Sequence, residues 1–115
     1  MSLLAPLLAP GLLTAHNSSS TSLLVKWTGL QEEDFRGKPI GYNIIYYPAV
    51  VEGDINFFRV NYMTNTTILT NLTIYTKYVI NVSAVSSGGI GPVKTAKART
   101  DAEGMGVFKH GLLVR

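Results

Sequence analysis

The sequence predicts an all-β protein in which seven antiparallel strands form a sandwich of two sheets. Two observations support this fold class. From residue 12 to residue 100, apolar residues alternate with polar ones at a period of two, and no segment carries an apolar stripe at the 3.6-residue period of a helix. Residues that favour turns, chiefly Gly, Pro, Asn and Ser, separate the alternating runs about every 8 to 12 residues, as the short loops of a sandwich require.

Each alternating run is expected to be a strand with one face toward the core. In residues 22–27, for example, Leu23, Val25 and Trp27 fall on one face, and the polar Lys26 falls on the other. In chain order, the strands are expected near residues 12–15, 22–27, 42–46, 56–61, 66–70, 78–85 and 96–98. In the later strands, the side chains expected to face the core are those of Tyr42, Ile44, Tyr46, Phe58, Val60, Thr67, Leu69, Tyr78, Ile80, Val82, Ala84, Ala96 and Ala98.

Length and composition favour one domain that folds without covalent crosslinks. A chain of 115 residues is long enough to bury a single core of ordinary size. It contains no Cys, which excludes disulfides and Cys-based metal sites. The net charge of +3, from 10 basic and 7 acidic residues, is too small an excess to indicate nucleic acid binding.

The two ends of the chain are expected to lie outside the domain. We expect residues 1–8 to be a leader, a linker or an expression-derived segment, residues 9–101 to be the domain, and residues 102–115 to be a C-terminal linker or tail. The apolar start resembles the apolar part of a signal peptide, but we do not expect a targeting segment, because no Lys or Arg precedes it and Pro6 and Pro10 interrupt it. It is also shorter than the roughly 20 apolar residues that span a membrane, so no membrane span is expected in this chain.

Acceptor sequences for N-linked glycans are unusually frequent. Asn-x-Ser/Thr triplets begin at Asn17, Asn65, Asn71 and Asn81. Random placement of the chain's 7 Asn and 19 Ser plus Thr residues would give about one such triplet. The excess predicts a glycoprotein that is secreted or lies on the extracellular side of the plasma membrane.

Five segments, taken in order, carry a family resemblance. They are the Pro-led run at residues 9–15, the Trp-ending run at 20–27, the Tyr-rich run at 40–47, the segment 72–78 in which Leu72 precedes Tyr78 by six residues, and the closing residues Ala84, 86–91 and 99–100. In this order and spacing they resemble a fibronectin type III domain over about residues 6–101. The resemblance implies an immunoglobulin-like sandwich. One departure is Ile74, where the family usually has proline, and it predicts a looser turn.

The resemblance also implies roles for four core residues, namely Trp27, Tyr42, Leu72 and Tyr78. An indole ring at Trp27 supplies a large apolar area between the sheets. A tyrosine at the start of a strand keeps its ring in the core while its hydroxyl bonds the backbone of the preceding turn. We interpret these residues as structural and not as a ligand-stacking site.

The sequence offers little material for catalysis. Its only histidines, His16 and His110, are far apart and lie in a turn and in the tail, so local spacing provides no metal pair and no base for a nucleophile. The carboxylates at residues 32–34 are consecutive and favour a solvated loop. The glycines at residues 88–91 favour a hairpin, since no helix follows them to bind phosphate. We therefore predict no enzyme activity, no cofactor and no metal.

Two surfaces are candidates for contacts with partners. By strand parity, Ile45, Tyr47, Phe57, Val79 and Val85 should form an apolar outer face, either shielded by a glycan on Asn81 or used to contact a neighbouring domain or a second copy. A basic strip of Lys77, Lys94, Lys97 and Arg99 would suit heparin or an acidic surface, although charges on a last strand also prevent pairing between sheet edges. If the family topology holds, loops 28–39, 61–65 and 86–92 share one end of the sandwich, and loops 16–20, 48–55 and 72–77 share the other.

The function that the resemblance implies is that of a non-catalytic binding or spacer module in a multidomain cell-surface receptor or adhesion protein, such as a receptor-type tyrosine phosphatase or a neural adhesion molecule. Three alternatives remain. A ligand-binding domain of a cytokine-type receptor would be favoured by paired cysteines or a Trp-Ser-x-Trp-Ser sequence, and neither occurs. A carbohydrate-binding module of a secreted enzyme would need an exposed aromatic strip, for which Tyr47 and Phe57 are a thin basis. An intracellular muscle-type module is disfavoured by the acceptor triplets.

Overall fold

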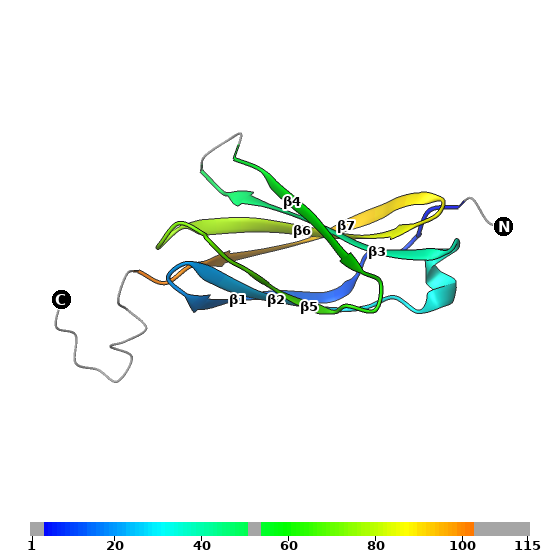
Figure 1. Cartoon of the computed structure of the whole chain (residues 1–115), viewed down its shortest axis with the longest axis horizontal. Coiled ribbons are helices and arrows are strands. Elements are labelled where there is room, and N and C mark those ends of the chain that lie inside the picture. The colour runs from blue at the N-terminus through cyan, green and yellow to red at the C-terminus, as the bar shows by residue number, and fades with distance from the viewer. Residues whose placement is uncertain (1–3, 51–53, 103–115) are drawn as a thin grey trace.

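A computed structural model describes residues 4–50 and 54–102, which form two antiparallel sheets packed face to face (Figure 1). One sheet has the order β1-β2-β5, with bounds β1 Gly11–Ser19, β2 Ser22–Thr28 and β5 Thr66–Leu69. The other has the order β4-β3-β6-β7, with bounds β3 Pro39–Pro48, β4 Asn56–Asn61, β6 Lys77–Ser86 and β7 Gly89–Arg99. The predicted all-β, seven-stranded sandwich is therefore confirmed.

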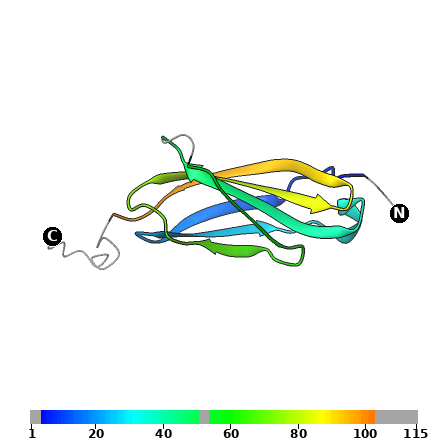
Figure 2. The same cartoon turned by 45° about the horizontal axis from the view of Figure 1, so that its top comes forward.

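The connections place two groups of loops at opposite ends of the sandwich (Figure 2). At one end, the Ser87 N–H bonds the Lys38 carbonyl at 2.9 Å, and the Trp27 N–H bonds the Asn65 carbonyl at 3.0 Å. The first bond joins the loops after β2 and β6, and the second ties the end of β2 to the loop after β4. At the other end, the Leu72 N–H bonds the Thr21 carbonyl at 2.9 Å. The segments that these bonds join group as the family topology implies, and residues 51–53 of the expected loop 48–55 lie outside the described residues.

The core lies between the sheets and consists of the inward residues of both. Trp27 from β2 and Tyr42 from β3 pack against one another toward the end that carries Phe35, with ring centroids 5.5 Å apart. Leu72 and Tyr78 are buried at the other end of the same cluster. Its other buried members are Leu23, Val25, Phe35, Ile44, Leu69, Ile80, Val82 and Ala84.

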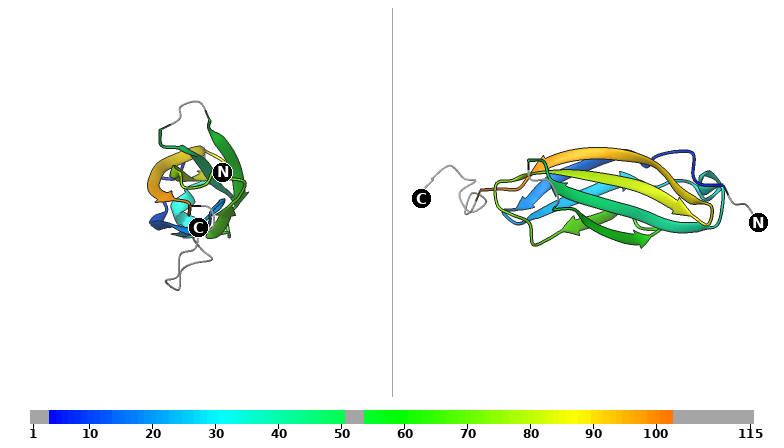
Figure 3. Two further views of the ribbon diagram at one scale, coloured as in Figure 1. Left: turned by 90° about the vertical axis from the view of Figure 1, so that its left-hand side faces the viewer. Right: turned by 90° about the horizontal axis from the view of Figure 1, so that it is seen from above.

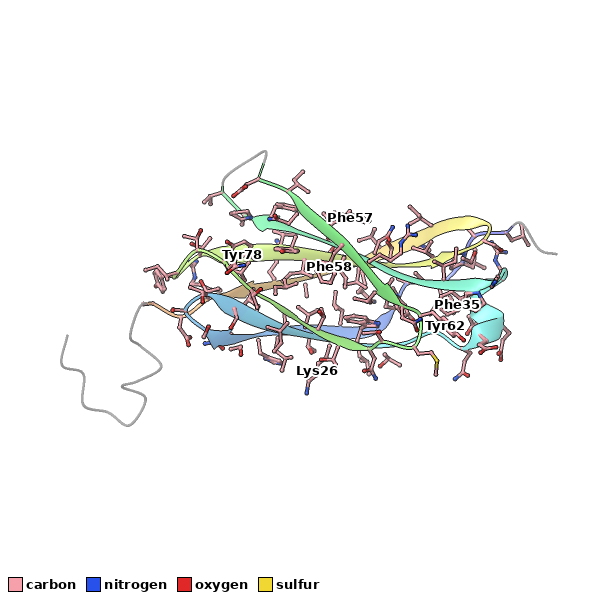
Figure 4. All side chains as sticks on the ribbon, in the orientation of Figure 1. Lys26, Phe35, Phe57, Phe58, Tyr62 and Tyr78 are labelled. Carbon is pink, nitrogen blue, oxygen red and sulfur yellow. The ribbon has the colours of Figure 1, made fainter. Side chains whose placement is uncertain are left out.

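One buried residue lies where the sequence predicts a solvated loop. Glu32–Phe35 form a single 3₁₀ turn, η1, which ends at Arg36 in the left-handed region at φ 61°. This turn directs Phe35 inward, where its side chain is fully buried. The Phe35 ring packs edge-on against Tyr42 and Tyr62, at centroid distances of 5.8 and 6.1 Å. Figure 4 shows Phe35 and Tyr62 facing one another at this end.

The first and last strands are longer than the alternation predicts. β1 pairs with β2 up to Ser19, and β7 begins at Gly89 directly after a turn at residues 87–88. Backbone hydrogen bonds can extend a strand through residues that have no apolar side chain. Polar and glycine-rich strand ends therefore cannot be recognised from the alternation of apolar residues. The segment 88–91 is thus a tight hairpin whose glycines lie mostly within the strand.

The segment before β1 lies against the body of the sandwich. Arg36 Nε donates to the Ala5 carbonyl at 2.9 Å, and Ser86 Oγ donates to the Leu4 carbonyl at 3.1 Å. Pro6 is buried against Gly91. At the opposite end, the Asp101 N–H bonds the Ser19 carbonyl at 3.2 Å. The described chain therefore enters at one end of the sandwich and leaves at the other (Figure 3).

The turn before β6 is held by the Tyr78 hydroxyl, although Ile74 replaces the usual proline. Tyr78 Oη accepts a hydrogen bond from the Thr73 N–H at 2.9 Å. Thr100 Oγ1 donates to the Thr73 carbonyl at 2.7 Å and accepts from the Thr76 N–H at 2.9 Å. The hydroxyls of Tyr78 and Thr100 therefore hold the turn from two sides without a proline.

Replacing Tyr78 with Phe should lower the free energy of unfolding by about 1 kcal/mol, because the Thr73 N–H loses its acceptor while the buried ring remains. Urea titration followed by Trp27 fluorescence measures this change. Tyr46→Phe is the matched control. The Tyr46 ring packs beside Tyr78 at 6.5 Å, but its hydroxyl makes no hydrogen bond within residues 4–50 and 54–102. Equal losses for the two variants would contradict a special role for the Tyr78 hydroxyl.

Replacing Gly41 with Ala should destabilise the pairing of β3 with β4 by about 2 kcal/mol. A Cβ atom at Gly41 would overlap the carbonyl oxygen of Val60, which is backbone and cannot rotate away. In Gly11→Ala, the matched strand control, the new Cβ lies 3.6 Å from Thr28 Cβ, which is ordinary contact. We expect this control to stay within about 0.5 kcal/mol of the wild type in the same urea titration. Comparable stability of Gly41→Ala would show that β4 shifts freely.

Candidate functional site

The outer face of the four-stranded sheet is arranged in rows that cross the strands. One row runs Phe57, Ile45, Asn81 and Thr95, from β4 to β7. The next row toward one end is Tyr47, Val79 and Lys97. Toward the other end lie Arg59, Asn43, Ser83 and Val93, and then Gly41, Val85 and Ile90. The five predicted contact residues thus share one face.

Val79 and Val85 are less accessible than that prediction requires. Their side chains are 9% and 4% exposed, respectively, and both lie on β6, which has a paired strand on each side. Val79, for example, lies between Tyr47 and Lys97 in its row. These two valines therefore cannot serve as an open contact surface.

The exposed apolar part of the face lies toward its two edges. Phe57 on the edge strand β4 is 58% exposed and points away from the core, whereas its neighbour Phe58 points into it (Figure 4). Ile45 and Tyr47 are half-buried beside it. On β7, Ile90 and Val93 are 58% and 54% exposed. The sequence did not reveal these last two residues, because alternation breaks down in the glycine-rich part of β7.

Three of the four glycan acceptors are exposed near the ends of the sandwich. Asn17 lies in β1, and its side-chain amide donates to the Asp101 carboxylate. Asn71 lies in the turn after β5, in the left-handed region at φ 59°. Asn65 precedes β5 at the opposite end, and its carbonyl accepts the Trp27 N–H. All three side chains can be reached from solvent.

The fourth acceptor, Asn81, lies in the middle of β6 on the outer face. Its side chain is half-buried. Asn81 Oδ1 accepts a hydrogen bond from Thr95 Oγ1 at 2.7 Å, across the β6–β7 pair. Ile45 is its partner on the other side, in β3. The Asn81 amide thus lies between the polar side chain of Thr95 and the apolar side chain of Ile45.

The residues of the predicted basic strip do not all share one face. Lys77 pairs with Arg99, and Lys97 lies two residues from Arg99 on the outer face. Lys94 pairs with the inward Val82, so it projects on the opposite side of β7. Arg99 is also engaged locally, because its guanidinium lies 4.9 Å from the Tyr75 ring centroid. Three of the four cations, Lys77, Lys97 and Arg99, therefore lie together on the outer face, and Arg99 contacts Tyr75.

The loop end next to η1 carries a shallow hollow of about 320 Å³. It is lined by Gly29, Leu30, Gln31, Glu32, Tyr62, Met63, Thr64 and Asn65. These residues come from the loops after β2 and β4, so the hollow is a feature of the loop cluster and not of the sheets.

The buried hydroxyl groups have a structural explanation. Burial raises the pKa of Tyr42, and a hydrogen bond from the Leu30 N–H at 2.8 Å acts in the opposite direction. Burial also raises the pKa of Tyr46, with a smaller contribution from Tyr78. The pKa of neither tyrosine is lowered, in keeping with the burial of Tyr42 in the core and the packing of Tyr46 against it.

The histidines and carboxylates of the described residues do not form a metal site. His16 is exposed on β1, and His110 lies outside the described residues. Among residues 4–50 and 54–102, no group of three or more His, Asp or Glu side chains could hold a metal ion. In the same part of the chain, no helix has the length and apolar character to cross a membrane.

The fold, the Tyr78 corner and the buried tryptophan together define an immunoglobulin-like β-sandwich module. A model of the fibronectin type III domain family matches residues 8–100, and the chain belongs to that family. Domains of this family are generally non-catalytic binding or spacer modules.

The relatives of the chain are domains within much larger proteins. It is 30% identical to a putative receptor-type tyrosine-protein phosphatase, mosPTP-1 of Aedes aegypti, over 84% of this chain and 8% of that protein. It is 29% identical to the human leukemia inhibitory factor receptor over 91% of this chain and 11% of that protein. The solution structure of a fibronectin type III domain of human contactin 1 superposes with a TM-score of 0.76 at 28% identity, covering 89% of this chain and 84% of that one. These relatives are cell-surface receptors or adhesion proteins.

Proposed function

We propose that this domain is a non-catalytic binding or spacer module in the extracellular part of a multidomain cell-surface receptor or adhesion protein. The observation that carries the proposal is the similarity of the chain to single domains of this class. It spans 8% of the receptor-type phosphatase and 11% of the leukemia inhibitory factor receptor, and it superposes on an isolated fibronectin type III domain of contactin 1. The four acceptor triplets support an extracellular position. The opposite placement of its two ends suits a module that spaces its neighbours along a chain (Figure 3).

An antibody against the folded domain tests this proposal on cells that express the full parent protein. We expect labelling of intact cells without permeabilisation, and a lower apparent mass of the parent protein after enzymatic removal of N-glycans. Labelling only after permeabilisation, together with unmodified acceptor asparagines, would refute the extracellular assignment and favour an intracellular structural module.

A second candidate is a ligand-binding domain of the cytokine-receptor type. The similarity to the leukemia inhibitory factor receptor favours it, and the hollow beside η1 offers a loop surface for a protein ligand. Soluble domain on a sensor surface, probed with medium from ligand-secreting cells, would support this candidate if Met63→Asp in the hollow reduced the captured signal. Equal capture by the wild type and the variant would argue against a ligand in the hollow.

A further inference from the structure

We infer that an N-linked glycan on Asn81 lies across the outer face of the four-stranded sheet and covers its apolar edge at Phe57. This inference rests on the proposed extracellular function. It concerns one modification site and the surface that the attached sugars contact.

The position of Asn81 is the first argument. It lies in the same row as Ile45 and Phe57, one and two strands away. Neighbouring strands are about 4.8 Å apart, so Phe57 lies roughly 10 Å from Asn81 across the sheet. The other acceptors lie elsewhere: Asn17 in the other sheet, and Asn65 and Asn71 in loops at the two ends. Only a glycan on Asn81 grows from the outer face itself.

The orientation of the amide is the second argument. Asn81 Oδ1 faces Thr95 on β7, to which it is bonded at 2.7 Å. The oxygen and nitrogen of an asparagine amide lie on opposite sides of the Cβ–Cγ bond, so Nδ2 is on the side of β3 and Ile45. Glycosylation substitutes Nδ2 and leaves Oδ1 free to accept, so the Thr95 bond survives the modification. The first sugar is therefore directed toward the apolar side of the row.

The chemistry of the surface is the third argument. A pyranose ring has a face of C–H groups and an edge of hydroxyls. The C–H groups carry partial positive charge, and the face of an aromatic ring is its negative part. Phe57, at 58% exposed, offers such a ring. Sugars laid on it would remove apolar area from water while their hydroxyls stay hydrated. Contact with a glycan is thus more favourable for this apolar face than exposure to water.

The experiment uses the full extracellular part of the parent protein, secreted from human cells, with glycopeptide mapping of all four acceptor sites. Ser83→Ala abolishes the Asn81 triplet but leaves Asn81 unchanged. Thr73→Ala, the matched control, abolishes the Asn71 triplet at an end of the sandwich. Each variant is also made without glycans in bacteria as the isolated domain, to measure the effect of the substitution alone. Midpoints of thermal unfolding, apolar-dye binding and sedimentation are compared.

We expect Asn81 to be occupied. Loss of its glycan in Ser83→Ala should lower Tm by about 4 °C beyond the shift seen in bacterial protein, and should raise dye binding. In a Phe57→Ser background, both differences should shrink, since the sugars lose their contact. Thr73→Ala should not show this dependence on Phe57.

Other outcomes overturn the inference in distinguishable ways. Modification of Asn17, Asn65 and Asn71 with Asn81 unoccupied would refute the glycan cover but leave the extracellular proposal intact. An occupied Asn81 with no dependence on Phe57 would place the sugars away from this face and refute the cover. Self-association through the face in glycosylated protein would assign it to a second copy. Absence of glycans at all four sites would refute the proposed function as well.

Discussion

Replacing Trp27 with Ala should lower the free energy of unfolding by about 3 to 5 kcal/mol. The side chain is 4% exposed and packs on Tyr42 between the two sheets. Removing it opens a cavity that neither sheet can close, because both are held in register by their backbone ladders. A domain of this size has a total stability of about 5 to 15 kcal/mol, so the variant should be marginally folded at 25 °C. Urea titration followed by circular dichroism gives the value.

A second substitution at the same position separates packing from polarity. Trp27 Nε1 is buried and has no acceptor among the residues that the structure describes. Trp27→Phe keeps an aromatic ring and removes this donor, whose burial without a partner costs about 1 to 3 kcal/mol. We expect the Phe variant to lose less than about 1 kcal/mol. A loss as large as that of the Ala variant would show that the indole N–H has a partner in solution.

Replacing Phe35 with Ala should cost about 3 kcal/mol, near the lower end for an aromatic core residue. Phe35 is fully buried, yet it comes from the loop after β2 and not from a strand. Its ring contacts Tyr42 and Tyr62, so its removal takes a packing partner from both tyrosine rings. The expected magnitude lies at the low end because a short 3₁₀ turn can settle inward more easily than a paired strand. Thermal and urea unfolding should agree on it.

Phe35→Leu is the matched control, since it keeps an apolar side chain of nearly the same reach. We expect it to recover more than half of the loss. Ile74→Ala, at a side chain 40% exposed in a different loop, should stay within about 0.5 kcal/mol of the wild type. If Phe35→Ala behaved like Ile74→Ala, the loop would be the solvated segment that its acidic sequence suggests.

The alternating strands could be predicted because successive side chains of a strand point to opposite faces of the sheet, so the pattern depends only on neighbouring residues in the sequence. Leu23, Val25 and Trp27 alternate with Lys26, and in the structure the first three are buried while Lys26 projects into solvent (Figure 4). The same parity placed Ile45, Tyr47 and Phe57 on one outer face. Parity does not report how deep a residue lies in its sheet. Val79 and Val85 proved buried, and both lie on β6, an inner strand whose partners β3 and β7 come from other parts of the chain.

The acceptor triplets show the same division. Their four positions are visible in the sequence, but only the register distinguishes Asn81 from the rest. The pairings of Asn81 with Ile45 and Thr95 bring together residues 36 and 14 positions apart in the chain. The residue pattern along one strand does not show which residues lie beside it in the sheet. The orientation of the Asn81 amide depends on one such neighbour, Thr95.

From its residues alone, this chain could be recognised as a sandwich of the fibronectin type III family, because period-two burial, turn residues and the Trp27 and Tyr78 positions are all local in origin. Folding in three dimensions made Phe35 a core residue, buried two valines of the outer face and placed Asn81 in the same row as the exposed Phe57. The physical reason is that depth and lateral neighbours arise from pairing between distant strands, and long-range pairing is a property of the whole sheet.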